Sequence, residues 1–241
     1  MRSSLLAWLV LARAVLAGSP LIHETFDDKA LDEKLWRVTR KHDFQDWKVE
    51  VADGRLRLMA ATIGTRPETV KWLGIATREP LVDLTRPVEI EFELDWNRQR
   101  NGCYLTAGLY LCPVETDAPK EQPDWLKVEY IGVPPGKNGR CEVASRVRGR
   151  LRLLYTEGWP LEQRTGRPLG RMRVKLTISN GRLALRENGK LLFELPKLEL
   201  GFQKARLYLQ MSSHSNYPPR TVFFDNVVVR PLQIGTQGAE S

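Results

Sequence analysis

The chain has 241 residues, of which 42% are hydrophobic, so one domain of ordinary composition has enough apolar residues for a full core. Its 37 lysines and arginines exceed its 29 aspartates and glutamates, which gives a net charge of +8. The basic residues do not gather in a tail, and the sequence holds no zinc-finger, helix-turn-helix or aromatic RNA-binding signature. We therefore expect no nucleic-acid partner.

The first 17 residues have the pattern of a secretory leader. Arg2 gives a positive start, an apolar run follows over Leu5–Ala12, and Val15–Ala17 fits a small-residue cleavage site. This predicts a signal peptide over residues 1–17 and a secreted, periplasmic or cell-surface protein. The alternatives are a short N-terminal anchor and an apolar leader on a cytosolic protein, because Arg13 interrupts the run. Cleavage would lower the net charge to +6. No stretch is long enough for stable membrane insertion.

Three cysteines are present, at positions 103, 112 and 141. Cys103 and Cys112 share one expected strand, so they are not expected to bridge each other. Cys141 could pair with either of them after export, or all three could be buried thiols. No Cys-x-x-Cys or Cys/His spacing predicts a zinc site.

From residue 53 onward, alternating segments separated by polar turns dominate the chain. Asp53-Gly54, Asn180-Gly181 and Asn188-Gly189 are strong turn signals, and the last of these predicts a hairpin over 181–196. Further strands are expected over 53–60, 88–96, 103–112, 126–133, 144–155, 171–179, 205–213 and 221–230. In the last of these, alternation places Val222, Phe224, Asn226 and Val228 on one face. With only residues 27–36 able to form a helical turn, the pattern predicts an all-β, two-sheet antiparallel jelly-roll sandwich. One domain over 21–232 and a flexible tail over 233–241 are expected.

Both ends of this region resemble concanavalin A-like lectin/glucanase domains, the laminarinase-like jelly rolls. HETFDDKALDEKLWRV, followed by WKVEVADGRLRLMA, is similar to their opening, and RTVFFDNVVVR is similar to their closing strand. ISNGRLALRENGKLLFEL is similar to the hairpin that often precedes that strand. The resemblance implies two curved antiparallel sheets with a concave face that handles carbohydrate.

The resemblance also implies a possible structural calcium, although no cofactor is required. In several relatives an acid on the last strand, with groups from the first strand, holds this ion. Asp225 is the matching position, and Glu24, Asp27 and Asp28 lie on the segment expected beside it. The alternative is that Asp225 and Asn226 only hydrogen-bond to neighbouring groups.

The stretch VEIEFELDW (88–96) is the candidate catalytic strand. Laminarinase-type hydrolases carry Glu-x-Asp-x-Glu there, and Glu89, Glu91 and Glu93 match with Glu in place of the central Asp. Retaining hydrolysis needs carboxyl groups roughly 5–5.5 Å apart, whereas on a regular strand Glu89 and Glu91 are about 6.7 Å apart at Cα and the outer pair about 13 Å.

Two other interpretations of this strand remain open. Mixed arginines and glutamates could bind sugar hydroxyls or an acidic sugar. The acids could instead form a cross-strand ladder with the basic residues of another strand. The candidate partners are Arg146, Arg148, Arg150 and Arg152, or Arg171, Arg173 and Lys175.

Loop residues supply the remaining candidates for ligand binding, because Trp and Tyr rings stack on sugars and His, Asn and Arg give directional hydrogen bonds. The candidates are Arg66, Lys71, Trp72, His214, Asn216 and Tyr217. We predict an exported, lectin-like domain that binds a polysaccharide or glycan. The alternatives are a glycoside hydrolase or polysaccharide lyase of the same fold, and a non-catalytic interaction or scaffold domain. The sequence leaves catalysis and oligomeric state open.

Overall fold

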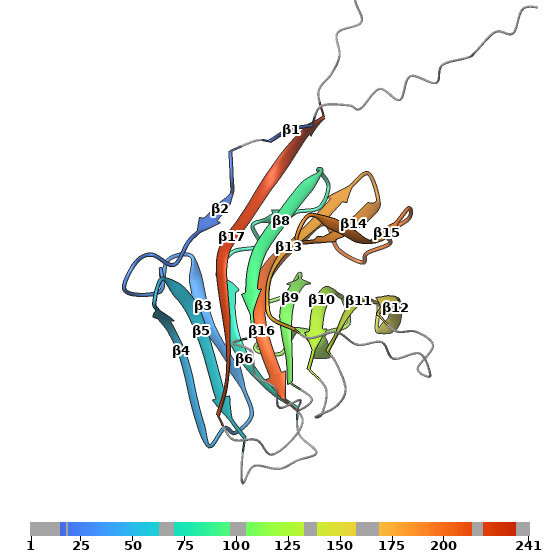
Figure 1. Cartoon of the computed structure of the whole chain (residues 1–241). Helices are drawn as coiled ribbons and strands as arrows, with labels where there is room; N and C mark the ends of the chain where they lie inside the picture. Colours follow the sequence, from blue (N-terminus) through green and yellow to red (C-terminus); the bar gives the residue numbers. More distant parts are fainter. Residues whose placement is uncertain are drawn as a thin grey trace, which may run out of the picture.

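A computed structural model represents the chain, and the structure describes residues 15–17, 19–62, 70–96, 105–132, 139–157, 169–213 and 219–234. These residues form two antiparallel β-sheets that pack face to face, as Figure 1 shows. A short 3-10 helix, η1 (Pro119–Glu121), lies in the connection between two consecutive strands of the second sheet. Within the described ranges, no helix is long and apolar enough to cross a membrane.

The first sheet has nine strands, and its long strand β17 organises it. One side of β17 pairs with β8, and the other side pairs in turn with β5, β2 and β1. The order across the sheet is β15 (Lys190–Leu195), β14 (Arg182–Glu187), β13 (Arg171–Ser179), β8 (Val88–Asp95), β17 (Arg220–Ile234), β5 (Arg55–Ala61) and β4 (Asp46–Ala52), with β2 (Ile22–Glu24) and β1 (Val15–Ala17) also on β17.

The second sheet has eight strands and carries the candidate site described below. Its order is β12 (Arg150–Thr156), β11 (Arg140–Val147), β10 (Trp125–Ile131), β9 (Leu105–Cys112), β16 (Lys204–Ser213), β6 (Lys71–Thr77) and β3 (Trp36–Lys41), with β7 (Val82–Asp83) on β16. Strands distant in sequence, such as β9 and β16, lie side by side. The predicted two-sheet antiparallel jelly-roll sandwich is confirmed.

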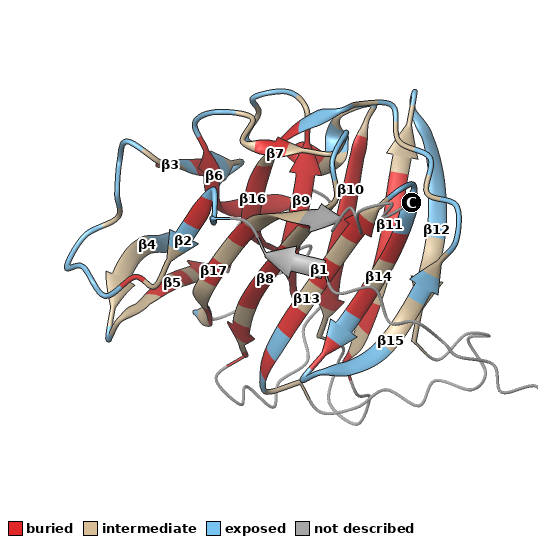
Figure 2. Ribbon diagram, turned by 90° about the horizontal axis from the view of Figure 1, so that it is seen from above, coloured by how far each residue is buried: buried red, intermediate tan, exposed pale blue. Residues whose placement is uncertain are grey.

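The core fills the space between the two sheets. Alternate residues of each strand face inward, and the central strands contribute side chains with essentially no exposure, including Phe92, Leu109, Leu207 and Phe224. Figure 2 shows buried residues along β8, β9 and β16, while the edge strands β12 and β15 are largely exposed or intermediate. Burial of this continuous apolar set stabilises the sandwich at roughly 25 cal/mol per Å² of apolar surface.

Residues 144–155 were predicted as one strand, and the structure shows two. Arg148 and Gly149 have φ values of +49° and +79° and form a two-residue turn between β11 and β12. Such a turn needs positive φ at both central positions, for which Asn-Gly and Asp-Gly are the usual signals. Arginine in the first of these positions concealed the hairpin.

The closing strand was predicted to alternate strictly, with Val222, Phe224, Asn226 and Val228 on one face. A bulge between Asp225 and Val228, with Asn226 at φ +50°, shifts that register by one residue. Val227 and Val229 therefore join Val222 and Phe224 in the core. The prediction was wrong because an extra residue in a bulge reverses the alternation beyond it.

The acidic residues of β8 point outward from the nine-stranded sheet and pair with cations on β13, β17 and β5. Glu93 lies 2.5 Å from Arg171, and Glu91 contacts Arg173 and Lys175. Glu89 and Asp95 extend the row through the pairs Glu89–Lys175 (3.2 Å), Glu89–Arg230 (3.4 Å) and Asp95–Arg55 (3.0 Å). This row matches the ladder interpretation, with Arg171, Arg173 and Lys175 among the partners.

The burial of each ion pair in the ladder decides how much that pair contributes to the free energy of unfolding. Glu93→Gln should lower the free energy of unfolding by at most about 1 kcal/mol, because its partner Arg171 is 58% exposed. Glu91→Gln should cost about 2 kcal/mol, because the Glu91 side chain is only 4% exposed and serves two cations. Urea unfolding of both variants at one pH and salt concentration measures the difference; equal losses would contradict this ranking.

Candidate functional site

The outer face of the eight-stranded sheet, which points away from the nine-stranded sheet, holds a second buried cluster. Its members are Trp72, Ala76, Tyr110, Cys112, Ala118, Trp125, Ala144 and Tyr208. An antiparallel sheet in a sandwich commonly leaves its outer face to water. Here part of the outer face is buried as well, so this face is not simply a solvent-exposed surface.

Polar side chains are buried on the same face. One row of cross-strand partners runs through Gly74, Gln210, Gly108, Glu129 and Glu142. A Cβ at Gly108 would lie 2.1 Å from the Val128 carbonyl oxygen, so only glycine fits beside β10. Two of the five positions, Gly74 and Gly108, lack a side chain, so the row is low in this face. The Glu129 side chain projects from it.

Glu129 is the centre of the site, and its residue exposure is 1%. Its Oε1 accepts hydrogen bonds from the Thr106 hydroxyl and the Tyr110 hydroxyl, both at 2.7 Å. Thr106 Oγ1 also lies 2.6 Å from the Ser212 hydroxyl. Since Thr106 has one proton and gives it to Glu129, Ser212 is the donor in that second bond. The hydroxyl chain therefore points its protons toward the carboxylate.

Lys127 joins Glu129 to a second carboxylate. Its Nζ lies 2.5 Å from Glu129 Oε2 and 2.6 Å from Glu142 Oε1. The Lys127 side chain is 2% exposed, so these two acids replace the water that a lysine ammonium would otherwise hold. Two carboxylates and one ammonium thus form a compact triad on β10 and β11, in which Lys127 and Glu129 are buried and Glu142 is half-buried.

The electrostatics keep Glu129, Lys127 and Tyr110 each in one protonation state near neutral pH. Burial raises the pKa of Glu129, but the charges of Lys127 and Lys120 and the hydrogen bonds from Lys127 and Thr106 outweigh it, and the pKa is about 2. Burial lowers the pKa of Lys127, but Glu129 and Glu142 raise it by more. Burial and the adjacent Glu129 charge raise the pKa of Tyr110. The site presents a fixed carboxylate, ammonium and phenol.

A pocket of about 220 Å³ opens beside this triad. Its lining residues are Thr106, Lys120, Lys127, Glu129, Ile131, Arg140 and Glu142.

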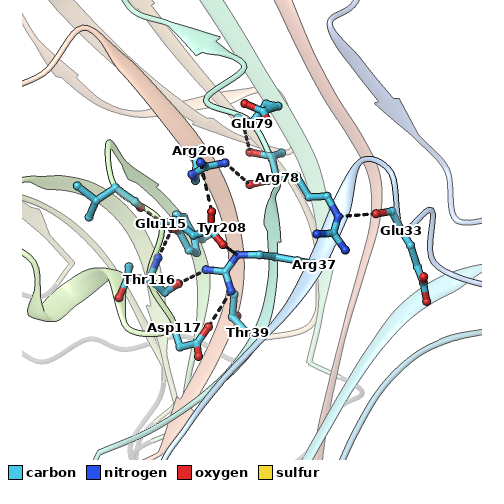
Figure 3. Close-up of polar contacts among 12 residues, drawn as sticks. Glu33, Arg37, Thr39, Arg78, Glu79, Glu115, Thr116, Asp117, Arg206 and Tyr208 are labelled. Atoms are coloured by element: carbon cyan, nitrogen blue, oxygen red, sulfur yellow. Dashed lines mark hydrogen bonds and ion pairs between the residues drawn. The ribbon is translucent and has the colours of Figure 1, made fainter.

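The segment between β9 and β10 delivers Lys120 to the pocket. Figure 3 shows the Arg37 guanidinium of β3 reaching toward Thr116, Asp117 and Tyr208. Arg37 donates to the Thr116 carbonyl at 2.6 Å and to Asp117 Oδ1 at 2.8 Å. Burial lowers the pKa of Arg37, but the bond and charge of Asp117 raise it by more, so the cation is well matched to its partner.

Further contacts hold the same segment on the sheet. Tyr208 donates to the Val114 carbonyl at 2.7 Å and accepts from the Thr116 N–H at 3.2 Å. Arg206 lies 3.4 Å from Glu115 (Figure 3). At the far end, Trp125 Nε1 donates to the Lys120 carbonyl at 3.0 Å. The segment is therefore anchored both ahead of η1 and within it.

The ligand-binding residues predicted from sequence divide among several places. Trp72 lies on the outer face near the network, with its ring 6.1 Å from that of Tyr110. Lys71, its neighbour in β6, is 1% exposed, and its side chain points to the opposite face of the sheet. Arg66, His214, Asn216 and Tyr217 lie outside the described residues. A catalytic role for Glu89, Glu91 and Glu93 stays a prediction, and those acids lie on the other sheet.

Glu129, Lys127 and Glu142 were missed by the sequence reasoning. The strand 126–133 was expected, but its Lys-x-Glu alternation looks like any solvent-facing ladder. The one available signal was composition: β9 places one glycine, one alanine and one threonine near this strand, and small residues leave space on a sheet.

The predicted calcium ligands hold other partners. Glu24 accepts hydrogen bonds from the Phe26 N–H at 2.9 Å and Trp36 Nε1 at 3.1 Å, one on each carboxylate oxygen. Asp225 accepts from the Asn226 N–H at 2.7 Å, and burial is the main cause that raises its pKa. In the part of the chain that the structure describes, no group of three or more His, Cys, Asp or Glu, Asp27 included, could hold a metal ion. These residues do not form a ready calcium site, and calcium stays a prediction.

The cysteines do not form the Cys112–Cys141 disulfide that was one of the open pairings. Cys112 is a free thiol on the outer face, whereas Cys141 faces the core between the sheets. Burial raises the pKa of Cys112 to about 11, so the thiol is protonated near neutral pH. Cys103 lies outside the described residues.

The arrangement of the two sheets is shared with solved structures. An endo-β-1,3-glucanase from Pyrococcus furiosus superposes with a TM-score of 0.62 at 12% identity, covering 92% of this chain and 99% of that one. The fold is that of a concanavalin A-like lectin/glucanase domain.

Other concanavalin A-like structures agree with this assignment of the fold. The catalytic domain of a laminarinase from Thermotoga petrophila matches with a TM-score of 0.59 at 13% identity, covering 93% of this chain and all of that one. A Bacillus subtilis protein of unknown function with a galectin-like fold gives a TM-score of 0.59 at 13% identity, over 91% and 99% of the two chains. No protein-family model matches the sequence. No curated protein matches it either.

Glu129 should make stability depend on acid pH. Its pKa is about 2 in the folded protein and 4.5 as an ordinary glutamate, so its contribution is complete above about pH 4.5 and is lost as the pH falls toward 2. Glu129→Gln should lower the free energy of unfolding at pH 7 by about 3 kcal/mol, because Lys127 loses a buried partner. Urea unfolding of parent and variant from pH 7 to pH 2.5 tests this. A difference between parent and variant that stays constant over that range would contradict it.

Proposed function

We propose that this concanavalin A-like domain binds carbohydrate on the outer face of its eight-stranded sheet, at the pocket beside Glu129. The observation that carries the proposal is the pocket of about 220 Å³ on this face, whose lining combines hydroxyl, ammonium, guanidinium and carboxylate groups. A sugar offers hydroxyl groups that both donate and accept, so it can bond to the donors and to the acceptors of this lining. Trp72 Nε1 and Gln210 Oε1, which are buried on the same face outside the pocket lining, have no hydrogen-bond partner.

Binding fits the chemistry of the site better than hydrolysis does. Glu129 and Glu142 contact one ammonium, so their carboxylates are close together, and this closeness is the one observation that favours a hydrolase. A retaining hydrolase, however, needs one of the pair protonated as a general acid, with a pKa near the working pH. Glu129 has a pKa of about 2 and gives no proton near neutrality, so it could serve only as the nucleophile of such a pair. Lys127 also occupies the space between the two acids.

A scaffold without a ligand would leave the outer face without such a pocket. On the nine-stranded sheet, the acids of β8 are paired with cations, as the scaffold interpretation expects. The pocket and the orphan polar atoms lie on the opposite sheet, and the ladder does not account for them. The names of solved structures with this fold, which include glucanases and mucin-degrading O-glycanases, add support for a glycan ligand.

We also propose that the chain is exported. The leader pattern over residues 1–17 supports this, and the buried clusters of the described residues begin at Ile22. Within the leader, the described strand β1 pairs with the end of β17. Cleavage after Ala17 therefore leaves both buried clusters complete.

Ile131→Trp should separate binding from stability. Ile131 lines the pocket and is half-buried at the end of β10, so a larger side chain there should fill the pocket and weaken binding of the best ligand on a glycan array at least about fivefold, with little change in the melting temperature. Calorimetric titration measures the affinity. Leu191→Trp is the control, because Leu191 is 41% exposed on β15 of the other sheet and the variant should bind as the parent does.

Two results would overturn the binding proposal. One is an array on which the parent binds no glycan, and the other is an Ile131→Trp variant with parental affinity. A reducing-sugar assay on the bound glycan should show no release of product; steady release would favour the hydrolase.

The export proposal predicts the N-terminus of the mature protein. When the full chain is produced in a bacterial host with a secretory pathway, N-terminal sequencing should give Gly18 as the first residue. A chain that remains in the cytosolic fraction with residues 1–17 attached would contradict export.

A further inference from the structure

The pocket beside Glu129 carries more positive than negative charge. Lys120, Lys127 and Arg140 line it with Glu129 and Glu142, which leaves one uncompensated positive charge. Ile131 supplies an apolar wall, and Thr106 is committed to Glu129 and Ser212. The charge balance alone does not select a ligand, so the partners of each charged group matter.

The inner three charges, one ammonium and two carboxylates, sum to −1. Lys127 lies 2.5 Å from Glu129 and 2.6 Å from Glu142, and its side chain is 2% exposed. Glu129 also accepts from Thr106 and Tyr110, so both of its oxygens have close donors. The two outer cations, Lys120 and Arg140, more than offset this single negative charge and bring the pocket to +1.

The two outer cations are held only loosely. Lys120 Nζ lies 4.0 Å from Glu129 Oε2, and Arg140 Nη2 lies 3.8 Å from Glu142 Oε2, at the long limit for an ion pair. Their side chains are 36% and 29% exposed. Arg140 Nε is buried and has no hydrogen-bond acceptor. Both cations thus keep capacity for an additional anionic partner.

A neutral ligand would leave this capacity unused. Filling the pocket removes water from Lys120 and Arg140, and a buried cation without a close acceptor is costly. A carboxylate or sulfate supplies two or three oxygens, and the guanidinium fork of Arg140 matches that planar or tripodal arrangement. An anionic group offsets the loss of water at both cations.

We propose that the glycan bound at this pocket carries an anionic group, a carboxylate or a sulfate, which Lys120 and Arg140 hold. The inference rests on the proposed carbohydrate-binding function and names its ligand class. Lys120 is positioned in advance, because Trp125 holds its carbonyl and the neighbouring Glu121 pairs with Lys41. Arg140 begins β11, beside Ile131 at the end of β10. Such preorganisation lowers the entropic cost of binding.

Three defined probes test the ligand class: tetragalacturonate, a sulfated galactan tetrasaccharide and the neutral laminaritetraose. Calorimetric titration at 150 mM salt should show at least about tenfold tighter binding of one anionic probe than of the neutral one. Arg140→Gln and Lys120→Gln should each weaken that binding by about tenfold or more, while any affinity for laminaritetraose stays within twofold. Whichever anionic probe binds tighter identifies the group as carboxylate or sulfate.

Matched variants separate the pocket from general attraction of polyanions to a basic protein. Arg182→Gln on β14 and Lys48→Gln on β4 remove the same charges from exposed positions on the other sheet and should bind within twofold of the parent. Arg140→Lys keeps the charge and loses the fork, so it should retain part of the affinity. It serves as the second variant if Arg140→Gln lowers the melting temperature.

Each remaining outcome counts against the inference in a different way. Equal binding of neutral and anionic probes that survives in both pocket variants overturns the anionic ligand and keeps the carbohydrate-binding function. Equal losses in the pocket and control variants show nonspecific attraction and overturn the inference. A parent that binds none of the probes and no glycan on the array overturns both proposals.

Discussion

A carboxylate buried on the outer face of a β-sheet is the constraint on which the rest of the site depends. An isolated charge in that position would cost several kcal/mol, so Glu129 is stable there only because charged and hydroxyl donors surround it. Lys127, Thr106 and Tyr110 supply those donors from two neighbouring strands. Each of them is ordered in turn by Glu129, which makes the network stiff and its protonation states constant.

The backbone makes room for this network. Gly108 lets β9 approach β10 where any Cβ would collide with the Val128 carbonyl. Because Gly108 has no side chain, the sheet surface beside Glu129 is low, and the pocket opens next to the Glu129 side chain. The segment after β9 then crosses this face, tied down by Arg37 and Tyr208, and brings Lys120 to the opening. Small residues and one clamped loop therefore shape the site as much as its charges do.

Two strands with similar polar patterns have opposite roles in this fold. Strand β8 alternates acids with apolar residues, and its acids meet arginines and lysines in a ladder on the nine-stranded sheet. Strand β10 also alternates, but its Lys127 and Glu129 are almost inaccessible to solvent. Alternation reports only that one side of a strand is polar. Whether that side faces water or a covered hollow depends on strands and loops far away in the sequence.

The amino-acid sequence by itself determined the sandwich, because period-two alternation and Asn-Gly or Asp-Gly turns are local signals that read directly as strands and hairpins. It did not determine the turn at Arg148-Gly149 or the bulge at Asn226, since both place a non-glycine residue at positive φ in a way that no local signal marks. The site was decided only by tertiary structure. Thr106, Glu129, Glu142 and Ser212 come from four strands, and pairing between distant strands is what places their side chains within hydrogen-bonding or ion-pairing reach of one network.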